Sequence, residues 1–140
     1  MGRLLGLDYG EKRIGIAASD PLQIIASPRE VLHRTTIDAD IDHIARIVEE
    51  DEVEAFVVGC PFNTDGTRNK MVERVEAFVA ELTVRCPIPV HWVDETYSSQ
   101  EAEEILRMES YDWRKRKPKI DMVAAQIILR NYLERPQNRE

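Results

Sequence analysis

The stretch Arg3-Leu-Leu-Gly-Leu-Asp-Tyr9 is an apolar run that ends in an acid and is followed by Gly10. A short run of this kind predicts a buried strand whose last residue reaches the edge of a sheet. Residues 13–19 (RIGIAAS) follow after a very short turn and predict a second strand. Residues 22–33 (LQIIASPREVLH) predict a third, with an irregularity at Pro28 because proline cannot donate to a strand ladder. The short connections predict an antiparallel meander.

The spacing of the apolar residues then changes from that of a strand to that of a helix. The new pattern predicts an amphipathic helix of about 14 residues with its acids turned toward water. The apolar positions are Ile37, Ile41, Ile44, Ile47 and Val48, and the acids are Asp38, Asp40, Asp42 and Glu49.

The rest of the chain alternates between strands and helices. Residues 54–59 are almost entirely apolar, which is typical of a strand covered on both faces, and residues 88–94 predict a fifth strand. Each of these strands follows a helix-bearing crossover, which favours parallel pairing. The sequence therefore predicts an α/β fold with one five-stranded mixed sheet and helices packed on its faces. Further elements are a loop at 60–67, a helix with Met71, Val72, Val75, Phe78, Val79 and Leu82 on its apolar side, a helix from the capping box at 98–101, an exposed loop at 109–118 and a last helix at 119–133.

The size of the chain predicts a single domain. We expect the domain to span residues 1–134, followed by a polar tail at 135–140. No run approaches the roughly 18 apolar residues of a membrane span, and Asp8 and Glu11 interrupt any secretory segment. The expected location is therefore the cytoplasm. Cys60 and Cys86 do not lie in a CxxC or a Cys/His spacing and are expected to be reduced and structural. The three histidines, His33, His43 and His91, are also expected to be structural.

The charge of the chain argues mildly against a protein that coats nucleic acid, with one local exception. The formal net charge is −7, which is unfavourable for non-specific binding of polyanions. A concentrated basic segment directly after Trp113 can nevertheless hold a phosphate backbone. A solvated loop is the simpler interpretation, and Trp113 either stacks on a base or anchors that loop. The segment contains Arg114, Lys115, Arg116, Lys117 and Lys119.

Carboxylates stand at the predicted strand ends, where ligands gather in open α/β sheets. Asp8 closes the first strand, and Asp94 and Glu95 close the fifth. Asp121 lies in the first turn of the last predicted helix, at the margin of its apolar stripe. Converging carboxylates repel one another, and a hard divalent cation such as Mg²⁺ or Mn²⁺ removes that conflict. Such a site activates a water for phosphodiester cleavage, particularly with two metals about 4 Å apart.

Each acid also has a simpler interpretation. Asp8 is explained equally well as a turn residue, and the acid pair after the fifth strand as an ordinary strand boundary. Asp121 is explained as an acid favoured by the helix macrodipole. Asn63, in the same way, fits a simple turn. Spacing alone therefore leaves open whether the acids meet at a metal.

Four longer motifs follow one another along nearly the whole chain. Residues 6–20 read GLDYGEKRIGIAASD, residues 58–66 read VGCPFNTDG, residues 93–96 read VDET and residues 119–129 read KIDMVAAQIIL. In this order they resemble the motifs of the YqgF/RuvX family, and the length of the chain fits that family.

The resemblance implies an RNase H-like fold related to Holliday junction resolvases. It implies a nuclease that matures the 5′ end of pre-16S rRNA in the bacterial cytoplasm, with Mg²⁺ or Mn²⁺ as cofactor. The family's acidic positions carry over onto Asp8, Glu95 and Asp121 as catalytic metal ligands, with Asp94 as a supporting residue. Many members have Arg after the Asp-Glu pair, whereas this chain has Thr96. If that Arg contacts phosphate in the family, its role here would fall to another cation, either Arg13 or the basic segment after Trp113. The candidates for nucleic-acid binding are these residues together with Asn63.

Three other functions stay open from the sequence. A Holliday junction resolvase would cut branched DNA symmetrically and would require a homodimer, whereas a nuclease for structured RNA also works as a monomer. A phosphate-binding domain of the actin and sugar-kinase type has a similar first strand but normally needs two domains. A non-catalytic RNA-binding module would keep the fold without cleavage. The motifs do not distinguish endonuclease from exonuclease, nor do they set the number of metals.

Overall fold

Five strands form one mixed sheet in the order β3-β2-β1-β4-β5. The computed structural model describes residues 2–60, 66–94 and 113–134. The central strand β1 is antiparallel to β2 and parallel to β4, and the edge strands continue these two pairings. The predicted meander and parallel crossovers are therefore confirmed. The strands are β1 (Arg3–Asp8), β2 (Arg13–Ser19), β3 (Ala26–His33), β4 (Val53–Cys60) and β5 (Val90–Asp94).

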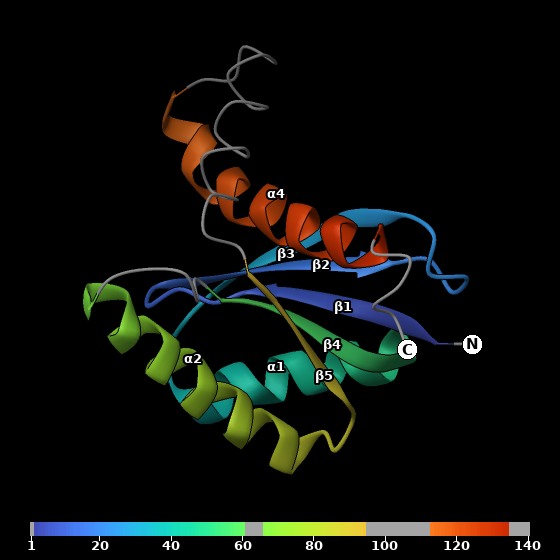
Figure 1. The fold of residues 1–140 in the computed structure, drawn as a ribbon, viewed down its shortest axis with the longest axis horizontal. Helices are drawn as coiled ribbons and strands as arrows, with labels where there is room; N and C mark the ends of the chain where they lie inside the picture. The colour runs from blue at the N-terminus through green and yellow to red at the C-terminus, as the bar shows by residue number, and fades with distance from the viewer. Residues whose placement is uncertain (1, 61–65, 95–112, 135–140) are drawn as a thin grey trace.

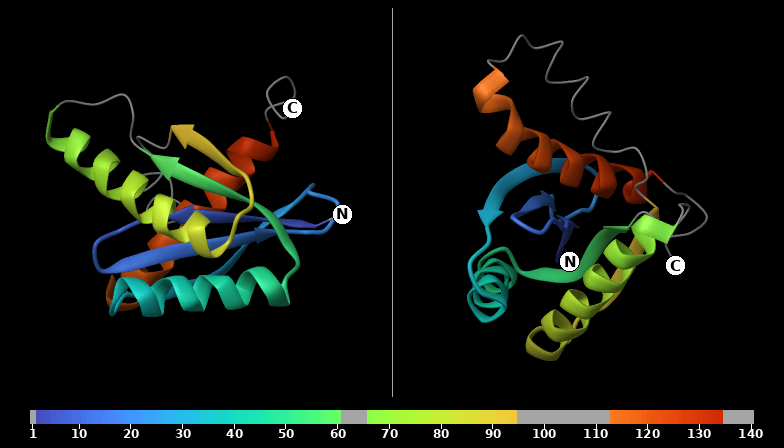
Figure 2. Two further views of the ribbon diagram at one scale, coloured as in Figure 1. Left: turned by 90° about the horizontal axis from the view of Figure 1, so that it is seen from below. Right: turned by 90° about the vertical axis from the view of Figure 1, so that its left-hand side faces the viewer.

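Within the described residues, one helix covers one face of the sheet and two helices cover the other (Figure 1). The long helix α4 (Trp113–Leu133) packs across β1, β2 and β3, whereas α1 (Ile37–Glu50) and α2 (Gly66–Arg85) lie on the opposite face. The end-on view in Figure 2 shows the sheet between the two helical layers. Across the described ranges, no helix is long and apolar enough to cross a membrane.

Both faces of the central strands are buried, which explains their nearly continuous apolar sequence. Leu5 and Leu7 of β1 join the core beneath α1 and α2. Leu4 packs on the other face, with Ile128 and Leu129 of α4. The alternation along β1 thus assigns each residue to a helical layer. Cys60 and Cys86 are buried and form no disulfide, as predicted.

Helix α1 matches its predicted length, but one of its acids lies inside the protein. Thr36 caps the helix, and its hydroxyl accepts the N–H of Ala39 at 3.1 Å. Asp40 is only 1% exposed, whereas Ile37 is 43% exposed. The prediction that Asp40 faces water is therefore wrong, because this carboxylate pairs with the partly buried guanidinium of Arg34.

The third strand begins later than predicted, because residues 22–25 form a turn. The carboxylate of Asp20 accepts the backbone N–H groups of Ile24 and Ile25 at 2.7 and 2.9 Å, and Gln23 adopts a left-handed φ of 59°. These side-chain contacts outcompete extended structure. The irregularity predicted at Pro28 is confirmed, since the register of β3 against β2 shifts there.

The last helix begins at Trp113, six residues before its predicted start. The predicted exposed loop is therefore wrong over residues 113–118, whose backbone is helical. Four of these six residues are Arg or Lys, which are strong helix formers, and the helix continues through Pro118. Residues 109–112, the helix predicted from residue 98 and the tail at 135–140 lie outside the described residues.

Candidate active site

Asp8 lies where the three parallel strands β1, β4 and β5 end, on the face that α4 covers. It is the last residue of β1 and stands opposite Gly15 of β2. Two residues earlier, a Cβ on Gly6 would meet Leu129 and Ala125 of α4. Because residues two apart on a strand share a face, the half-buried Asp8 also faces the α4 layer.

Asp94 shares this edge with Asp8 but lies on the opposite face. It pairs in register with Cys60 of β4, and Cys60 belongs to the core beneath α1 and α2. The preceding residue, Val93, packs with the α4 core instead. The structure thus brings Asp8 and Asp94 to one end of the sheet without bringing them to one face. Glu95, the predicted ligand, lies outside the described residues.

Asp121 belongs to the described backbone of α4, although its side chain does not belong to the described atoms. The helix is anchored close to β1 one turn later, where the carbonyl oxygen of Ala125 lies 3.1 Å from the position of a Cβ on Gly6. Among the residues with described side chains, no three His, Cys, Asp or Glu residues form a group able to hold a metal. The described side chains do not include those of Glu95 and Asp121, two of the three predicted ligands.

The predicted nucleic-acid contacts are described only in part. Arg13 is the first residue of β2, two residues beyond Gly15, and therefore shares the face of Asp8. Asn63 lies outside the described residues. The basic segment from Arg114 to Lys119 occupies the first turns of α4, and its side chains are not among those described.

A network that was not predicted from the sequence holds the turn directly after Asp8. The guanidinium of Arg34 donates to the Asp40 carboxylate at 3.0 Å, to the Tyr9 hydroxyl at 2.7 Å and to the Gly10 carbonyl at 3.2 Å. It also lies over the rings of Tyr9 and Phe78. Because Tyr9 and Gly10 follow Asp8 in the chain, the network fixes the backbone that leaves the site.

The partners of Arg34 stabilise its positive charge. Burial lowers the pKa of Arg34, but its hydrogen bonds to Asp40 and Tyr9 outweigh that effect, so the net pKa is raised. Asp40 also accepts the backbone N–H of Thr35 at 3.1 Å. The sequence held one signal for this pair: Asp40 stands between Ile37 and Ile44 at helical spacing, where a solvated acid is not expected.

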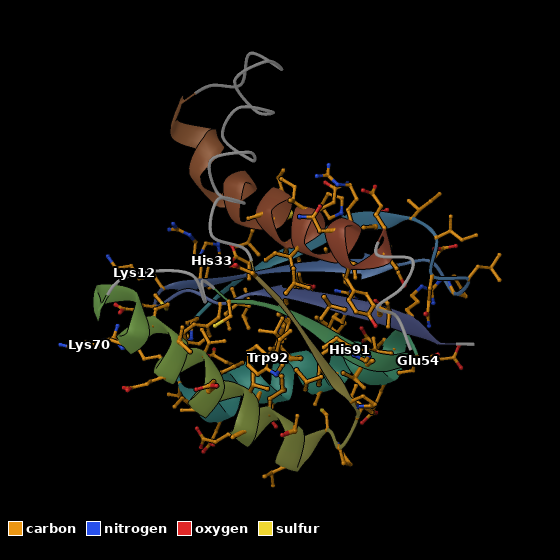
Figure 3. The ribbon with its side chains drawn as sticks, viewed as in Figure 1. Lys12, His33, Glu54, Lys70, His91 and Trp92 are labelled. Carbon is orange, nitrogen blue, oxygen red and sulfur yellow. The ribbon has the colours of Figure 1, made fainter. Side chains whose placement is uncertain are left out.

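Two histidines have structural contacts, in line with the sequence. His43 of α1 hydrogen-bonds Glu30 at 2.6 Å, and His91 of β5 stacks on the ring of Tyr132 in α4. His33 differs, because it is exposed at the end of β3. Figure 3 shows His33 at the same end of the molecule as Lys12, well away from His91.

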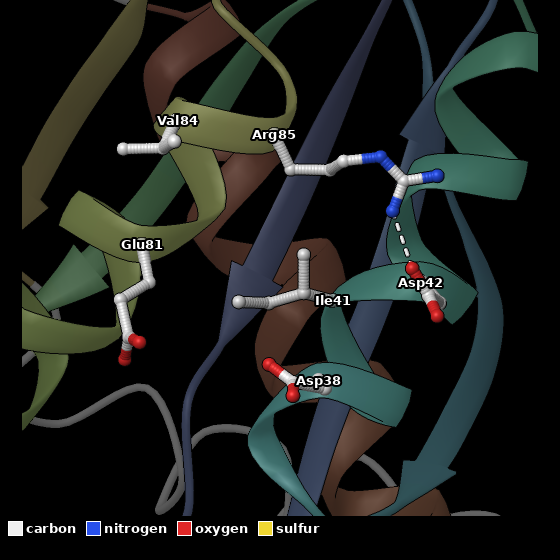
Figure 4. Close-up of a pocket in the computed structure, with 6 residues that line it drawn as sticks. All are labelled: Asp38, Ile41, Asp42, Glu81, Val84 and Arg85. Carbon is white, nitrogen blue, oxygen red and sulfur yellow. Dashed lines mark hydrogen bonds and ion pairs between the residues drawn. The ribbon is translucent and has the colours of Figure 1, made fainter.

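A hollow of about 650 Å³ between α1 and α2 lies on the other side of the sheet (Figure 4). Arg85 pairs there with Asp42. Its charged lining consists of three carboxylates and this one guanidinium, so its electrostatics disfavour a polyanion. The lining residues are Asp38, Ile41, Asp42, Glu81, Val84 and Arg85.

Comparison with solved structures shows the class of fold. RuvC of Thermus thermophilus, solved in complex with a Holliday junction substrate, aligns with a TM-score of 0.55 and 13% identity, over 89% of this chain and 92% of that one. The Fowlpox virus resolvase, solved with Holliday junction DNA, gives 0.55 and 11%, over 94% and 97%. The protein therefore has the RNase H-like fold of these resolvases, as predicted.

Comparison of sequences shows the family. The family model described as "RuvX: Holliday junction resolvase" matches residues 2–135. A curated relative from Maridesulfovibrio salexigens, named "Putative pre-16S rRNA nuclease", is 41% identical over 133 residues, which cover 95% of this chain and 98% of the relative. The chain belongs to the RuvX/YqgF family.

Proposed function

We propose that the protein is a divalent-metal-dependent nuclease that hydrolyses phosphodiester bonds of pre-16S rRNA in the cytoplasm. The observation that carries this proposal is the place of Asp8, a half-buried carboxylate at the carboxyl end of the central strand, on the α4 face. Ligand sites of open α/β sheets lie at that edge. RNA is favoured over branched DNA because the relative with a pre-16S rRNA nuclease name is 41% identical. The two solved Holliday junction resolvases compared above share 13% identity or less, although the matching family model also carries a resolvase description.

The surroundings of Asp8 fit a hard metal ion. Its neighbours on the same face are Gly6 along β1 and Gly15 across on β2, and neither carries a side chain that would fill the space beside the carboxylate. Carboxylate oxygens are the ligands that Mg²⁺ and Mn²⁺ prefer. Asp8, Glu95 and Asp121 would hold the ion, which would supply an activated water and stabilise the leaving oxygen.

The alternation along β5 supports Glu95 rather than Asp94 as the partner of Asp8. Val93 faces α4 and Asp94 faces the opposite layer. Because Asp94 faces away from the layer that Asp8 faces, we infer that the ligand of this acid pair is Glu95. We assign Asp94 a supporting role only.

Helix α4 supports the third ligand. Ala125 packs against β1 at Gly6, and Asp121 precedes Ala125 by four residues, or about one helical turn. Asp121 and Asp8 thus belong to a helix and a strand that pack against each other. A role for the basic segment from Arg114 to Lys119 in holding the RNA backbone stays a prediction of the same proposal.

The test uses one preparation of the protein and two substrates, a 5′ precursor segment of 16S rRNA and a four-way DNA junction. Each is incubated with Mn²⁺, with Mg²⁺ and with EDTA. Cleavage of the RNA with either metal, absent in EDTA, is the expected result. Symmetric cleavage of the junction alone, by a dimer, would instead establish a resolvase. RNA binding that is insensitive to EDTA, with no cleavage under any metal, would establish a non-catalytic module.

A further inference from the structure

A row of nitrogen-bearing side chains continues outward from Asp8 across strands β2 and β3. Asp8 stands opposite Gly15 of β2. Arg13 lies two residues away from Gly15 along β2, beyond the end of β1, and on the same face. Arg13 in turn stands opposite His33 of β3. Neighbouring strands are about 4.8 Å apart, so the row leads diagonally away from the candidate metal site and crosses two strands.

The row is open to solvent at its outer end. His33 and Lys12 are both exposed, and Arg13 is half-buried. Figure 3 shows Lys12 and His33 at the same end of the sheet. The turn that carries Lys12 is held in place, because its carbonyl accepts the backbone N–H of Arg34 at 2.9 Å. We call Lys12, Arg13 and His33 the β2–β3 rim.

Asp8 itself is the described carboxylate that stands at the inner end of this row, and three other groups of described acids lie near the rim or further away. Glu11, in the same turn, forms an ion pair with Arg74 of α2. The acids of the α1–α2 hollow lie on the opposite face. The acidic stretch at residues 49–54 lies at the other end of the sheet, where the backbone carbonyl of Glu52 accepts the backbone N–H of Arg3 at the start of β1. The rim thus brings the two cationic side chains of Lys12 and Arg13 together with the imidazole of His33, in a chain of net charge −7.

We propose that the β2–β3 rim binds the backbone phosphates of the RNA strand that leaves the Asp8 site across β2 and β3. The proposal rests on the proposed nuclease function and adds the path of the substrate and the residues that hold it. The planar guanidinium of Arg13 matches a phosphate in geometry, Lys12 adds a point charge and His33 adds a ring N–H donor. His33, which the sequence suggested to be structural, thereby gains a role in binding.

The test measures binding of the labelled precursor RNA in EDTA, so that no cleavage occurs, over a series of salt concentrations. The variant Lys12→Gln/Arg13→Gln/His33→Gln is compared with wild type and with Arg46→Gln, which removes an exposed arginine from α1. We expect Arg46→Gln to bind like wild type. We expect the triple variant to bind more weakly, with a log Kd against log salt slope that is shallower by about 0.7 for each phosphate that the rim no longer neutralises.

Two further readouts keep the test independent of folding and of catalysis. Thermal unfolding checks each variant, and His33→Gln alone repeats the comparison at one exposed position, again with weaker binding expected. In cleavage assays the triple variant should raise KM while kcat stays near wild type. If the triple variant has the wild-type affinity and the wild-type slope of log Kd against log salt, the rim does not bind RNA. RNA binding through the rim without cleavage under any metal would leave the rim intact and defeat the nuclease proposal.

Discussion

Gly6 of β1 and Leu129 of α4 approach so closely that a Cβ on Gly6 would lie 3.0 Å from the Cβ of Leu129. The carbonyl oxygen of Ala125 would lie 3.1 Å from the same position. This close approach sets the height of α4 above the central strand. Since Asp8 ends that strand and Asp121 belongs to that helix, the absence of a side chain at Gly6 is a geometric requirement of the proposed site.

The first prediction concerns this close approach. Gly6→Ala should lower the free energy of unfolding by about 1–3 kcal/mol, because an added methyl group overpacks a site that backbone and Cβ atoms enclose. It should also reduce metal-dependent cleavage, since α4 must move away from β1. Urea unfolding and the cleavage assay measure the two effects. Unchanged stability with unchanged cleavage would show that the height of α4 does not matter.

The second prediction concerns the buried pair behind the turn that follows Asp8. Arg34 is 13% exposed at its side chain and Asp40 is 1% exposed. Asp40→Asn leaves the guanidinium buried without its counter-charge and should lower the free energy of unfolding by about 3 kcal/mol. Urea denaturation provides the measurement.

Asp42→Asn is the matched control for this prediction. Asp42 lies in the same helix and pairs with Arg85, but both side chains are about half exposed, at 59% and 49%. Exposed pairs contribute little to stability, so this variant should unfold close to wild type. Equal losses in the two variants would show that burial of the Arg34–Asp40 pair is not what stabilises this region.

The third prediction concerns the pH dependence of the turn before β3. Backbone N–H groups of Ile25 and Ile24 hydrogen-bond the Asp20 carboxylate and hold its pKa below the ordinary value of 3.8. A lowered folded-state pKa means that this contribution to stability is complete above pH 3.8 and is lost as the pH falls through the folded-state pKa. Asp20→Asn should therefore flatten the acid limb of stability against pH, measured by urea midpoints from about pH 6 to about pH 2. An identical acid limb in variant and wild type would count against this role.

Much of the fold follows from the sequence because both faces of its central strands are buried. The apolar run from Leu4 to Leu7 and the helical spacing from Ile41 to Ile47 each identify their element without reference to the rest of the chain. The turn at residues 22–25 was not predictable in this way. Its apolar residues favour a strand, and only the hydrogen bonds of Asp20 to the backbone reverse that preference.

The site was less predictable than the fold. Strand ends identify Asp8, but only the register of β5 shows that Asp94 faces away from it. The Arg34–Asp40 pair joins residues from a loop and a helix, and Tyr9 joins it from a third segment. The helical spacing of Asp40 indicates that it is not an ordinary solvated acid, but no local pattern specifies Arg34 and Tyr9 as its partners. The exposure of His33 beside Arg13 likewise depends on the register of β3.

The assignment of Asp8 as the central carboxylate is tested most directly by a comparison of two conservative variants in one cleavage assay. Asp8→Asn and Asp94→Asn each remove one charge at the same edge of the sheet, on opposite faces. With Mn²⁺ and the precursor rRNA segment, Asp8→Asn should lose more than about 100-fold in cleavage rate, beyond the range for an outer partner of a metal. Asp94→Asn should lose less than about tenfold. Wild-type activity in Asp8→Asn, or a larger loss in Asp94→Asn, would contradict the proposed site.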